Sequence, residues 1–342
     1  MKKLLIIGSN SVHTFNYIDL ISDYFDEILL VTNKHNPESK IKQITADFHY
    51  SFQSFFETPK KIRKLVEEYK PTHIHVHQAN SYAFFTARAL GSKKNMVLTA
   101  WGSDILLLPK KNIFWHKMVQ YSLRKFSFIT ADSQEVANEI TTLTKVQNPV
   151  LVANFGIVIQ EVSMEKENFI YSNRLHKPLY RVDKVLQAFH RFLQTKPKDN
   201  WILVVGAVGT ETEYLKQLSK ELRIDDQVKF VGWLDSETNR NWYARARFWI
   251  SIPESDATSI SLLEAMAYGC IPIVSNLPSN KEWITDGENG FIIKNLDEEY
   301  IEEMLAIDFE KAIQINKERI LRDGTKEANR QKFFNLYDQI SA

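Results

Sequence analysis

Cysteine, glycine and proline are all scarce in this chain of 342 residues. The single cysteine, Cys270, excludes an intramolecular disulfide, so we expect a reducing, cytoplasmic setting. Glycine (11) and proline (10) are too few for a fibrous or low-complexity protein. No apolar run approaches the roughly 18 residues of a membrane span. The run Leu4–Ile7 ends at Gly8, too early for a signal-peptide core, and we interpret it as a first β-strand.

The chain also lacks a large excess of positive or negative residues, since its formal net charge is +1. The charges are nevertheless unevenly distributed along the chain. Residues 1–160 carry 19 lysines and arginines against 13 acidic residues, and the remainder carries 24 against 29. A basic first half and an acidic second half indicate two domains with different partners. No basic block or recognition motif accompanies this asymmetry, so nucleic acid is not an expected partner.

Short apolar runs alternate with helical patterns along the whole chain, which is typical of parallel α/β sheets covered on both faces. We therefore predict two doubly wound, Rossmann-like domains, residues 1–160 and 161–325, that face each other across a cleft. The boundary is expected in the charged segment Ile159–Asn168, and a C-terminal helix at about 326–342 is expected to pack back on the first domain. The predicted strands are Lys3–Ile7, Glu27–Val31, Thr72–His77, Asn95–Thr99, Phe126–Ala131, Val150–Val152, Asn168–Ser172, Trp201–Gly206, Gln227–Val231, Phe248–Ile252, Ile271–Ser275 and Gly290–Ile293.

The segment Pro253–Ser275 contains the most informative motif. A predicted strand leads into a loop rich in serine and threonine, and a helix follows that ends near Gly269. Such a helix start offers free N–H groups and a positive dipole end to a phosphate. Asp256 before the helix and Glu264 within it would place one carboxylate on each side of a diphosphate. The alternative is simple helix capping with solvated carboxylates. The residues expected at the phosphate are Thr258, Ser259, Ile260 and Ser261.

These residues resemble the signature of family-four glycosyltransferases, which have the GT-B fold. That family has two acidic residues eight positions apart, a helix of the form LLEAMA-x-G, and a following apolar strand. Leu262–Gly269 matches the helix closely, and Glu282–Gly290 matches a later E-x-x-x-D-G-x-x-G run. The first acidic position is usually glutamate in the family and is Asp256 here. The following T-S-x-S is similar to a variant found in bacterial surface-glycan transferases.

The resemblance implies retaining transfer of a sugar from a nucleotide-diphosphate donor, with a UDP-sugar favoured over a GDP-sugar. It implies no cofactor and no divalent metal, and an acceptor that is a glycan or is lipid-linked, as in polysaccharide or lipopolysaccharide assembly. Two alternatives stay open: a sugar-nucleotide epimerase of the same fold, and a catalytically silent module that binds a sugar nucleotide. A glycan phosphorylase is less favoured, because we find no motif for a pyridoxal-phosphate lysine.

A basic cluster follows the strand expected at Asn168–Ser172. Arg174 matches the arginine that the family directs at the leaving diphosphate, where positive charge stabilises the departing anion. The family's Lys-Gly pair, about six positions later, is replaced by Tyr180 and Arg181. We expect Lys177 or Arg181 to substitute for the missing lysine, and Lys177 is our candidate. The alternative is a solvated basic loop.

Further glycine-containing turns end strands and suit a nucleotide pocket. Gly206 and Gly232 are expected to let the backbone approach the donor, and the family resemblance places the turn at Trp233 near the base. Gly8 and Ser9 resemble the family's loop near the donor phosphates. For Trp233, simple packing is the alternative.

Three residues of the first domain are candidates for the acceptor side. His13 follows the first strand, and either orients an acceptor hydroxyl or caps a helix. His77 is the last of three histidines that alternate along one strand. Such spacing can suggest zinc, but no cysteine or acidic ligand accompanies it. Trp101 stands where the family has a histidine near the donor sugar, and a tryptophan can stack on a sugar ring but cannot transfer a proton.

The segment Lys110–Lys125 mixes basic and aromatic residues. Such a surface helix can lie on an anionic membrane, which allows peripheral contact with the inner face of the cytoplasmic membrane. The alternative is an ordinary domain helix with a solvated basic face.

Overall fold

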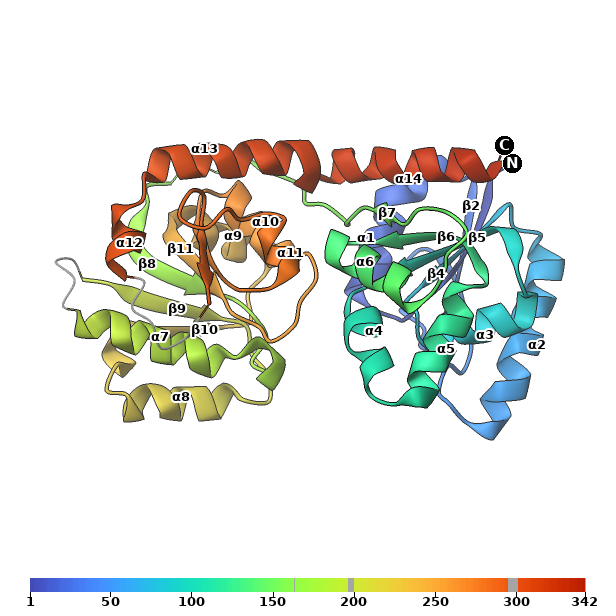
Figure 1. Ribbon diagram of the computed structural model, residues 1–342, viewed down its shortest axis with the longest axis horizontal. Coiled ribbons are helices and arrows are strands. Elements are labelled where there is room, and N and C mark those ends of the chain that lie inside the picture. The colour runs from blue at the N-terminus through green and yellow to red at the C-terminus, as the bar shows by residue number, and fades with distance from the viewer. Residues whose placement is uncertain (163, 196–199, 295–300, 342) are drawn as a thin grey trace. The chain divides into compact units, whose positions relative to one another are not determined.

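The computed structural model describes residues 1–162, 164–195, 200–294 and 301–341. The chain forms two compact units. Unit 1 comprises Met1–Phe155 together with Lys326–Ala342, and unit 2 comprises Gly156–Thr325. Each unit is built on one sheet of parallel strands with helices packed against it (Figure 1). Within the described ranges, no helix has both the length and the apolar character needed to span a bilayer.

The sheet of unit 1 has seven strands in the order β3-β2-β1-β4-β5-β6-β7. Its strands are β1 (Lys3–Ile7), β2 (Glu27–Thr32), β3 (Lys42–Thr45), β4 (His73–His77), β5 (Lys93–Ala100), β6 (Phe126–Ala131) and β7 (Leu151–Val152). The sequence did not predict β3. Its residues KQIT form no apolar run, because this edge strand pairs only with β2 and none of its side chains is buried.

The helices of unit 1 are α1 (Val12–Ile21), α2 (Phe52–Tyr69), α3 (Ser81–Leu90), α4 (Ser103–Leu106), α5 (Ile113–Leu123), α6 (Gln134–Leu143) and α14 (Lys326–Ser341). Helix α14 comes from the C-terminal end of the chain and shares a core with α1 and β1. Tyr17, Phe333 and Tyr337 are fully buried there against Leu4 and Ile6. The first 155 residues therefore complete their core with a segment that is distant in sequence.

The sheet of unit 2 has six strands in the order β10-β9-β8-β11-β12-β13. They are β8 (Glu167–Ser172), β9 (Ile202–Gly206), β10 (Val228–Gly232), β11 (Ala246–Ser251), β12 (Ile271–Ser275) and β13 (Phe291–Ile293). All six correspond to predicted strands, and their ends differ from the predicted ends by at most two residues. The agreement arises because most of these strands are short apolar runs with buried side chains. The edge strand β10 has no buried residue, but it still contains an apolar run.

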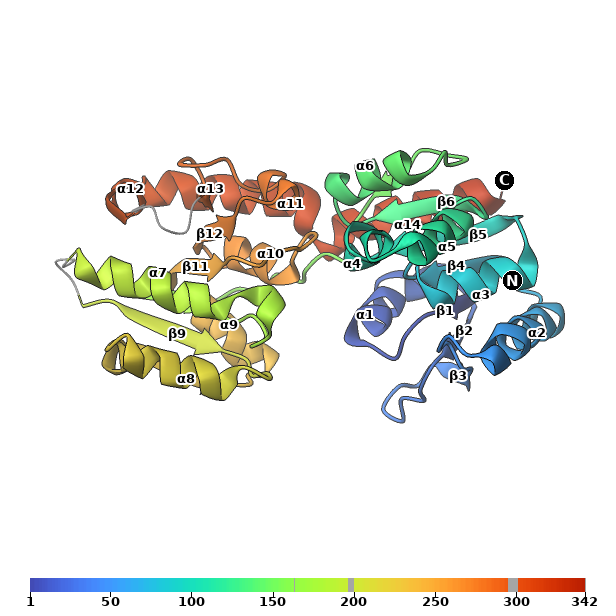
Figure 2. The same cartoon turned by 60° about the horizontal axis from the view of Figure 1, so that its bottom comes forward.

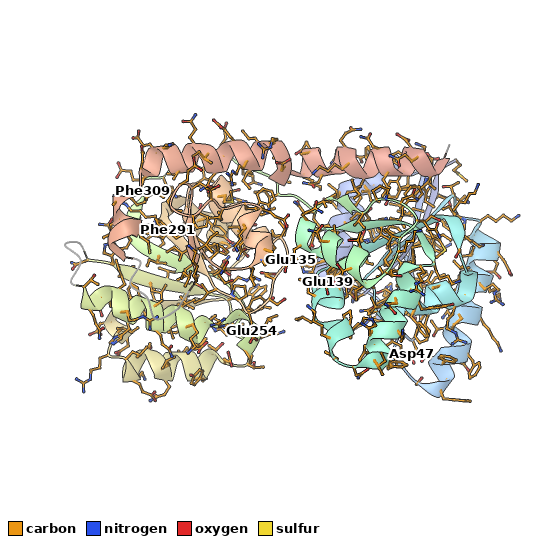
Figure 3. The ribbon with its side chains drawn as sticks, in the orientation of Figure 1. Asp47, Glu135, Glu139, Glu254, Phe291 and Phe309 are labelled. Atoms are coloured by element: carbon orange, nitrogen blue, oxygen red, sulfur yellow. The ribbon has the colours of Figure 1, made fainter. Side chains whose placement is uncertain are left out.

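The helices of unit 2 are α7 (Val182–Gln194), α8 (Thr212–Glu221), α9 (Ser236–Arg245), α10 (Ile260–Ala267), α11 (Pro278–Lys281), α12 (Ile301–Ala306) and α13 (Phe309–Arg319). Two separate apolar cores surround the sheet. One contains Phe291 of β13, with Phe309 of α13 packed against it (Figure 3). The other contains Leu262, Leu263 and other buried residues of α10. The apolar residues of that helix therefore anchor it firmly beneath the loop that precedes it.

Each sheet has one point where its strand order reverses, between β1 and β4 in unit 1 and between β8 and β11 in unit 2. At such a point the loops beyond the carboxyl ends diverge and leave a crevice where ligands bind in open α/β sheets. Gly8 follows β1, and His77 ends β4. Arg174 follows β8, and Asp256 follows β11. The candidate residues thus lie at the two reversal points.

Replacing Phe333 by alanine should destabilise unit 1, because it leaves a cavity beside Tyr17, whose ring centroid lies 5.0 Å from that of Phe333. We expect the free energy of unfolding to fall by about 3–5 kcal/mol. Chemical denaturation, followed by hydrogen exchange of unit 1 amides, measures this loss. The matched control is Gln331→Ala, an exposed position on the same helix, which should change stability by less than about 0.5 kcal/mol. Equal stability of the two variants would contradict the structural role of α14.

Candidate functional site

Arg174 joins the two loops that flank the reversal point of unit 2. Its Nη2 donates to Oδ2 of Asp256 at 2.7 Å, and its Nη1 donates to the hydroxyl of Ser259. The guanidinium also lies over the ring of Tyr180, 4.4 Å from the centroid. Burial by itself would lower the pKa of Arg174, but the Asp256 carboxylate and Tyr180 raise it above its ordinary value. Arg174 is therefore a permanent, nearly buried cation at the carboxyl edge of the sheet.

A second contact ties the same two loops together. The backbone N–H of Glu254, which follows β11 (Figure 3), donates to the carbonyl of Leu179 at 3.0 Å. Leu179 belongs to a short 3-10 turn, Pro178–Tyr180, that carries Tyr180 to its place over Arg174. The cation is thus held from both sides by loops that are themselves connected.

The N-terminus of α10 has no side-chain cap. Ser259 occupies the N-cap position, but its hydroxyl accepts from Arg174 and not from the helix backbone. The first N–H groups of a helix have no intrahelical partners, and the helix dipole makes this end positive. Thr258 is held by Trp283, whose indole donates to its hydroxyl at 3.4 Å. The start of α10, including Ile260 and Ser261, and Arg174 together form an electropositive spot that suits an anion.

Asp256 is occupied by contacts within the protein. Besides Arg174, its carboxylate accepts from the backbone N–H of Ala257 at 3.1 Å, and its carbonyl accepts from Ser279 at 2.8 Å. The ion pair offsets part of the charge of Arg174. That Asp256 and Glu264 flank a diphosphate stays a prediction.

Glu264 lies on α10 within a network of buried polar side chains. Tyr243 donates a hydrogen bond to Glu264 and accepts one from Nδ2 of Asn173 at 2.7 Å. Asn173 also accepts from the indole of Trp249 at 2.9 Å and donates to Asn239 at 3.0 Å. Burial raises the pKa of Glu264, and the hydrogen bond from Tyr243 partly opposes this rise. The network fixes the direction of the carboxylate.

Glycines at the end of β9 and in the loop after it allow other parts of unit 2 to pack closely against them. A Cβ at Gly206 would lie 3.0 Å from the Tyr171 hydroxyl, and one at Gly209 would lie 2.3 Å from the carbonyl oxygen of His176. His176 is buried, with Nε2 donating to the Gly206 carbonyl at 3.1 Å and Nδ1 within 2.8 Å of the Thr212 hydroxyl. Sequence reasoning missed His176, because no local pattern links it to β9. Contact between Gly206 and a ligand stays a prediction.

Gly232 and Trp233 form the turn at the end of β10. Gly232 has φ of 72°, in the left-handed region that favours glycine. Trp233 is 71% exposed, so its side chain is not part of the core. The packing alternative is therefore wrong for Trp233, and its ring is free to meet a ligand.

The backbone explains how the basic cluster relates to the family motif. Arg181 has φ of 52°, which suits glycine, and it stands where the resemblance places the glycine of the Lys-Gly pair. Tyr180, in the lysine position, packs against Arg174. Lys177 is exposed and Arg181 is half-buried. Lys177 as the substitute for the family lysine stays a prediction.

In unit 1, Gly8 lies tightly against the neighbouring strand. A Cβ there would be 3.3 Å from Cβ of His77 and 3.3 Å from Oγ1 of Thr14. Ser9 donates to Ser11 at 3.1 Å, and Ser11 caps α1. The loop is therefore short and ordered by its own hydrogen bonds.

His77, Trp101 and His13 lie together beside this loop. The indole of Trp101 donates to Nδ1 of His77 at 3.0 Å, and the ring centroids of His13 and Trp101 are 5.1 Å apart. Because Nδ1 accepts, the proton of neutral His77 is on Nε2, which has no hydrogen-bond partner among the described residues. Burial, and to a smaller extent His13, lowers the pKa of His77 to about 3. His77 is thus a neutral, buried donor.

Structural partners occupy the other two histidines of β4. His75 contacts the hydroxyls of Thr99 at 2.6 Å and Tyr337 at 2.7 Å, and His73 contacts the carbonyl of Tyr337 at 3.1 Å. The part of the chain that the structure describes has no cluster of three or more possible metal ligands. Tyr337, which sequence reasoning missed as a partner, gives these histidines a role in docking α14.

Two family models match the chain. Residues 157–323 match the model described as glycosyl transferases group 1, and residues 2–133 match the model described as glycosyl transferase 4-like. The N-acetyl-α-D-glucosaminyl L-malate synthase of Bacillus anthracis is 24% identical over 331 residues, which are 90% of this chain and 82% of that protein. The chain is a glycosyltransferase of the GT-B type.

Solved structures agree with this fold. The Anabaena protein HepE in complex with UDP has a TM-score of 0.81, with 14% identity and coverage of 99% of this chain and 100% of that one. Sucrose-phosphate synthase from Thermosynechococcus elongatus has a TM-score of 0.79, with 15% identity and coverage of 100% and 99%. The expected α/β fold class and glycosyltransferase family are therefore confirmed.

Replacing Tyr243 by phenylalanine in this glycosyltransferase should destabilise it in a pH-dependent way. The change removes the donor to Glu264 and one of the two acceptors of Asn173, at a cost of about 1–3 kcal/mol. It should also raise the pKa of Glu264 further. A carboxyl pKa that is raised by folding costs stability as pH rises above the unfolded value, so the loss should be larger near pH 7 than near pH 4.

Denaturant titrations at the two pH values measure this difference. Tyr214→Phe is the matched control, because Tyr214 is exposed on α8. A destabilisation by Tyr243→Phe that is equal at both pH values would contradict the link to Glu264.

Proposed function

We propose that the chain is a retaining glycosyltransferase that takes its sugar from a nucleotide-diphosphate donor, with UDP-sugars favoured over GDP-sugars. The observation that carries this proposal is the buried Arg174 beside the uncapped N-terminus of α10. Both present N–H groups and positive charge at the edge where an open α/β sheet binds ligands. The structures of HepE in complex with UDP and with UDP-glucose support the choice of base.

The diphosphate is proposed to bind between Arg174 and residues Thr258–Ser261. A guanidinium has five N–H groups, and its contacts with Asp256, Ser259 and Tyr180 leave others for phosphate oxygens. Negative charge grows on the diphosphate as the glycosidic bond breaks. A preorganised cation therefore stabilises the transition state more than the ground state.

Glu264 is proposed to accept hydrogen bonds from the ribose hydroxyls. Glu264 is largely but not completely buried, and Tyr243 and Asn173 hold its carboxylate from the core side. Gly206, Gly232 and Trp233 are proposed to line the rest of the nucleotide site, and Lys177 to add charge near the phosphates. Arg174 and the first N–H groups of α10 supply positive charge where negative charge develops on the diphosphate. We therefore propose that no divalent metal takes part.

The acceptor is proposed to be a glycan or a lipid-linked sugar used in bacterial surface-glycan assembly, bound by residues of unit 1. Neutral His77 offers its Nε2–H to an oxygen, and His13 and Trp101 offer ring surfaces to a sugar. Gly8 and Ser9 lie at the start of α1 beside them. Transfer from the same face as the leaving phosphate, with the phosphate assisting, retains the anomeric configuration.

Arg174 variants should lower kcat more than they change KM. We expect Arg174→Ala to reduce kcat by about 10²–10³, with Arg174→Lys recovering only part because it lacks the forked geometry. The measurement is steady-state transfer with the UDP-sugar that most raises the melting temperature in a panel.

Arg245→Lys is the matched control, because Arg245 makes a two-point pair with Glu167, at 2.6 and 3.0 Å, on α9. Circular dichroism checks that all variants fold. Near-normal kcat in folded Arg174→Ala would overturn the assignment. An acceptor-independent product would instead favour an epimerase, and no turnover with any donor would favour a silent binding module.

Chelators should leave the transfer rate intact, since Arg174 and the N-terminus of α10 supply the positive charge. The rate is measured with and without excess EDTA, after prior dialysis against the chelator. Loss of turnover that magnesium or manganese restores would refute metal independence without affecting the assignment of Arg174.

A further inference from the structure

Unit 1 carries an unusual number of exposed aromatic and apolar side chains on two of its helices. Phe52 and Phe56 on α2 are 85% and 47% exposed, and Ile113 and Phe114 on α5 are 71% and 56% exposed. Single exposed apolar residues are common on proteins, but a contiguous group of them marks an interaction surface.

Ring contacts join these side chains into one group, which we name the aromatic surface. Tyr50 connects the helices, with ring centroids 6.2 Å from Phe114 and 6.3 Å from Phe84. Helix α3, which carries Phe84, packs against both α2 and α5 (Figures 1 and 2). The aromatic surface consists of Tyr50, Phe52, Phe55, Phe56, Phe84, Phe114, Trp115 and Tyr121, linked in a chain of ring contacts.

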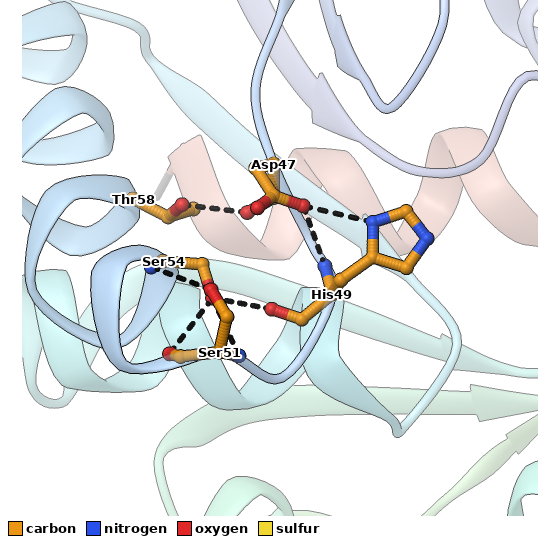
Figure 4. A network of polar contacts seen from close by, with 5 residues as sticks. All are labelled: Asp47, His49, Ser51, Ser54 and Thr58. Carbon is orange, nitrogen blue, oxygen red and sulfur yellow. Dashed lines mark hydrogen bonds and ion pairs between the residues drawn. The ribbon is translucent and has the colours of Figure 1, made fainter.

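The start of α2 is fixed by a network of polar contacts (Figure 4). Ser51 and Ser54 form a capping box, and Ser54 also donates to the carbonyl of His49. Thr58 donates to the carbonyl of Asp47 at 2.6 Å, and the Asp47 carboxylate accepts from the His49 backbone at 2.9 Å. Because these bonds set where the helix begins, Phe52 and Phe56 are held outward instead of collapsing onto the core.

Positive charge accompanies the aromatic surface. Residues 105–131, which include α5, contain five lysines and arginines and no aspartate or glutamate. Lys117 lies one turn after Ile113 and Phe114, so it shares their side of α5. Arg88 on α3 lies over the ring of Phe55, 3.4 Å from the centroid. Helix α2 carries four basic residues against three glutamates, so its acidic residues do not cancel this excess.

We propose that the aromatic surface docks unit 1 on an anionic lipid bilayer. Aromatic rings with exposed tips suit the headgroup region, and lysines beside them are attracted to acidic lipids. A second copy of the chain fits this surface less well, because two such basic faces would repel each other. The proposal concerns lipid binding alone and is independent of the donor chemistry.

The test is flotation of the full chain with vesicles of phosphatidylcholine, with and without about 30% phosphatidylglycerol. Wild type should float with the anionic vesicles at low salt, bind neutral vesicles at least tenfold more weakly, and dissociate as salt is raised. Phe52→Ser combined with Phe114→Ser should weaken binding at least tenfold. Lys111→Gln combined with Lys117→Gln should weaken it roughly fivefold for each charge removed.

The matched controls remove similar side chains from unit 2. Tyr214→Ser with Leu321→Ser removes two exposed apolar side chains, and Lys220→Gln with Lys229→Gln removes two exposed charges. Both should bind vesicles as wild type does. Circular dichroism verifies folding, and single substitutions Phe52→Ser and Phe114→Ser provide a milder pair.

Three results would overturn the proposal. The first is that wild type does not float with anionic vesicles. The second is that the aromatic and control variants lose binding equally. The third is that vesicle binding is absent and sedimentation shows a self-association that Phe52→Ser with Phe114→Ser abolishes. The last result would assign the aromatic surface to contact between copies of the chain.

Discussion

The contact of Arg174 with Asp256 and Ser259 is the interaction on which the arrangement of unit 2 depends. It bridges the loops after β8 and β11, which leave the sheet in different directions at its reversal point. A buried guanidinium without a carboxylate would be costly, so the pair keeps the cation in place. The same contact withdraws the hydroxyl of Ser259 from capping α10, and leaves the first N–H groups of the helix for an anion. Arg174 therefore both connects the two loops and contributes to the proposed anion site.

Two further networks of buried polar groups are held in the same way, each by several partners. Asn173 and Tyr243 orient Glu264 from inside unit 2, and burial raises the pKa of that carboxyl because its charged form loses solvation. In unit 1, His75 joins the hydroxyls of Thr99 and Tyr337, which connects β4 to α14. Satisfied networks of this kind make a unique packing arrangement, because any shift would leave a polar atom without a partner. His77 differs, since its Nε2 has none among the described residues.

The two units use charge for different purposes. In unit 2, Arg174 and a helix end place positive charge at the reversal point of the sheet, within a half of the sequence where acidic residues outnumber basic ones. In unit 1, the basic residues are spread over the surface, and residues 105–131 carry them beside exposed aromatic rings. The first arrangement suits a small, highly charged ligand, because a buried cation is little screened by salt. The second suits an extended surface, where many weak, screened contacts add together.

The sequence by itself determined the fold class, twelve of the strands and the bounds of α10 to within two residues, and it placed Arg174 just after a strand. Those features depend on local apolar runs and on a motif whose residues are neighbours in the chain. Only the tertiary structure decided that Tyr337 docks on His75, that His176 fills the space at Gly209, that Asn173 supports Tyr243, and that Tyr50 links Phe114 to Phe84. Each of these contacts joins residues that lie on different elements of the fold. The polar edge strand β3 was missed for the same reason, because pairing with β2 and not its own composition makes it a strand.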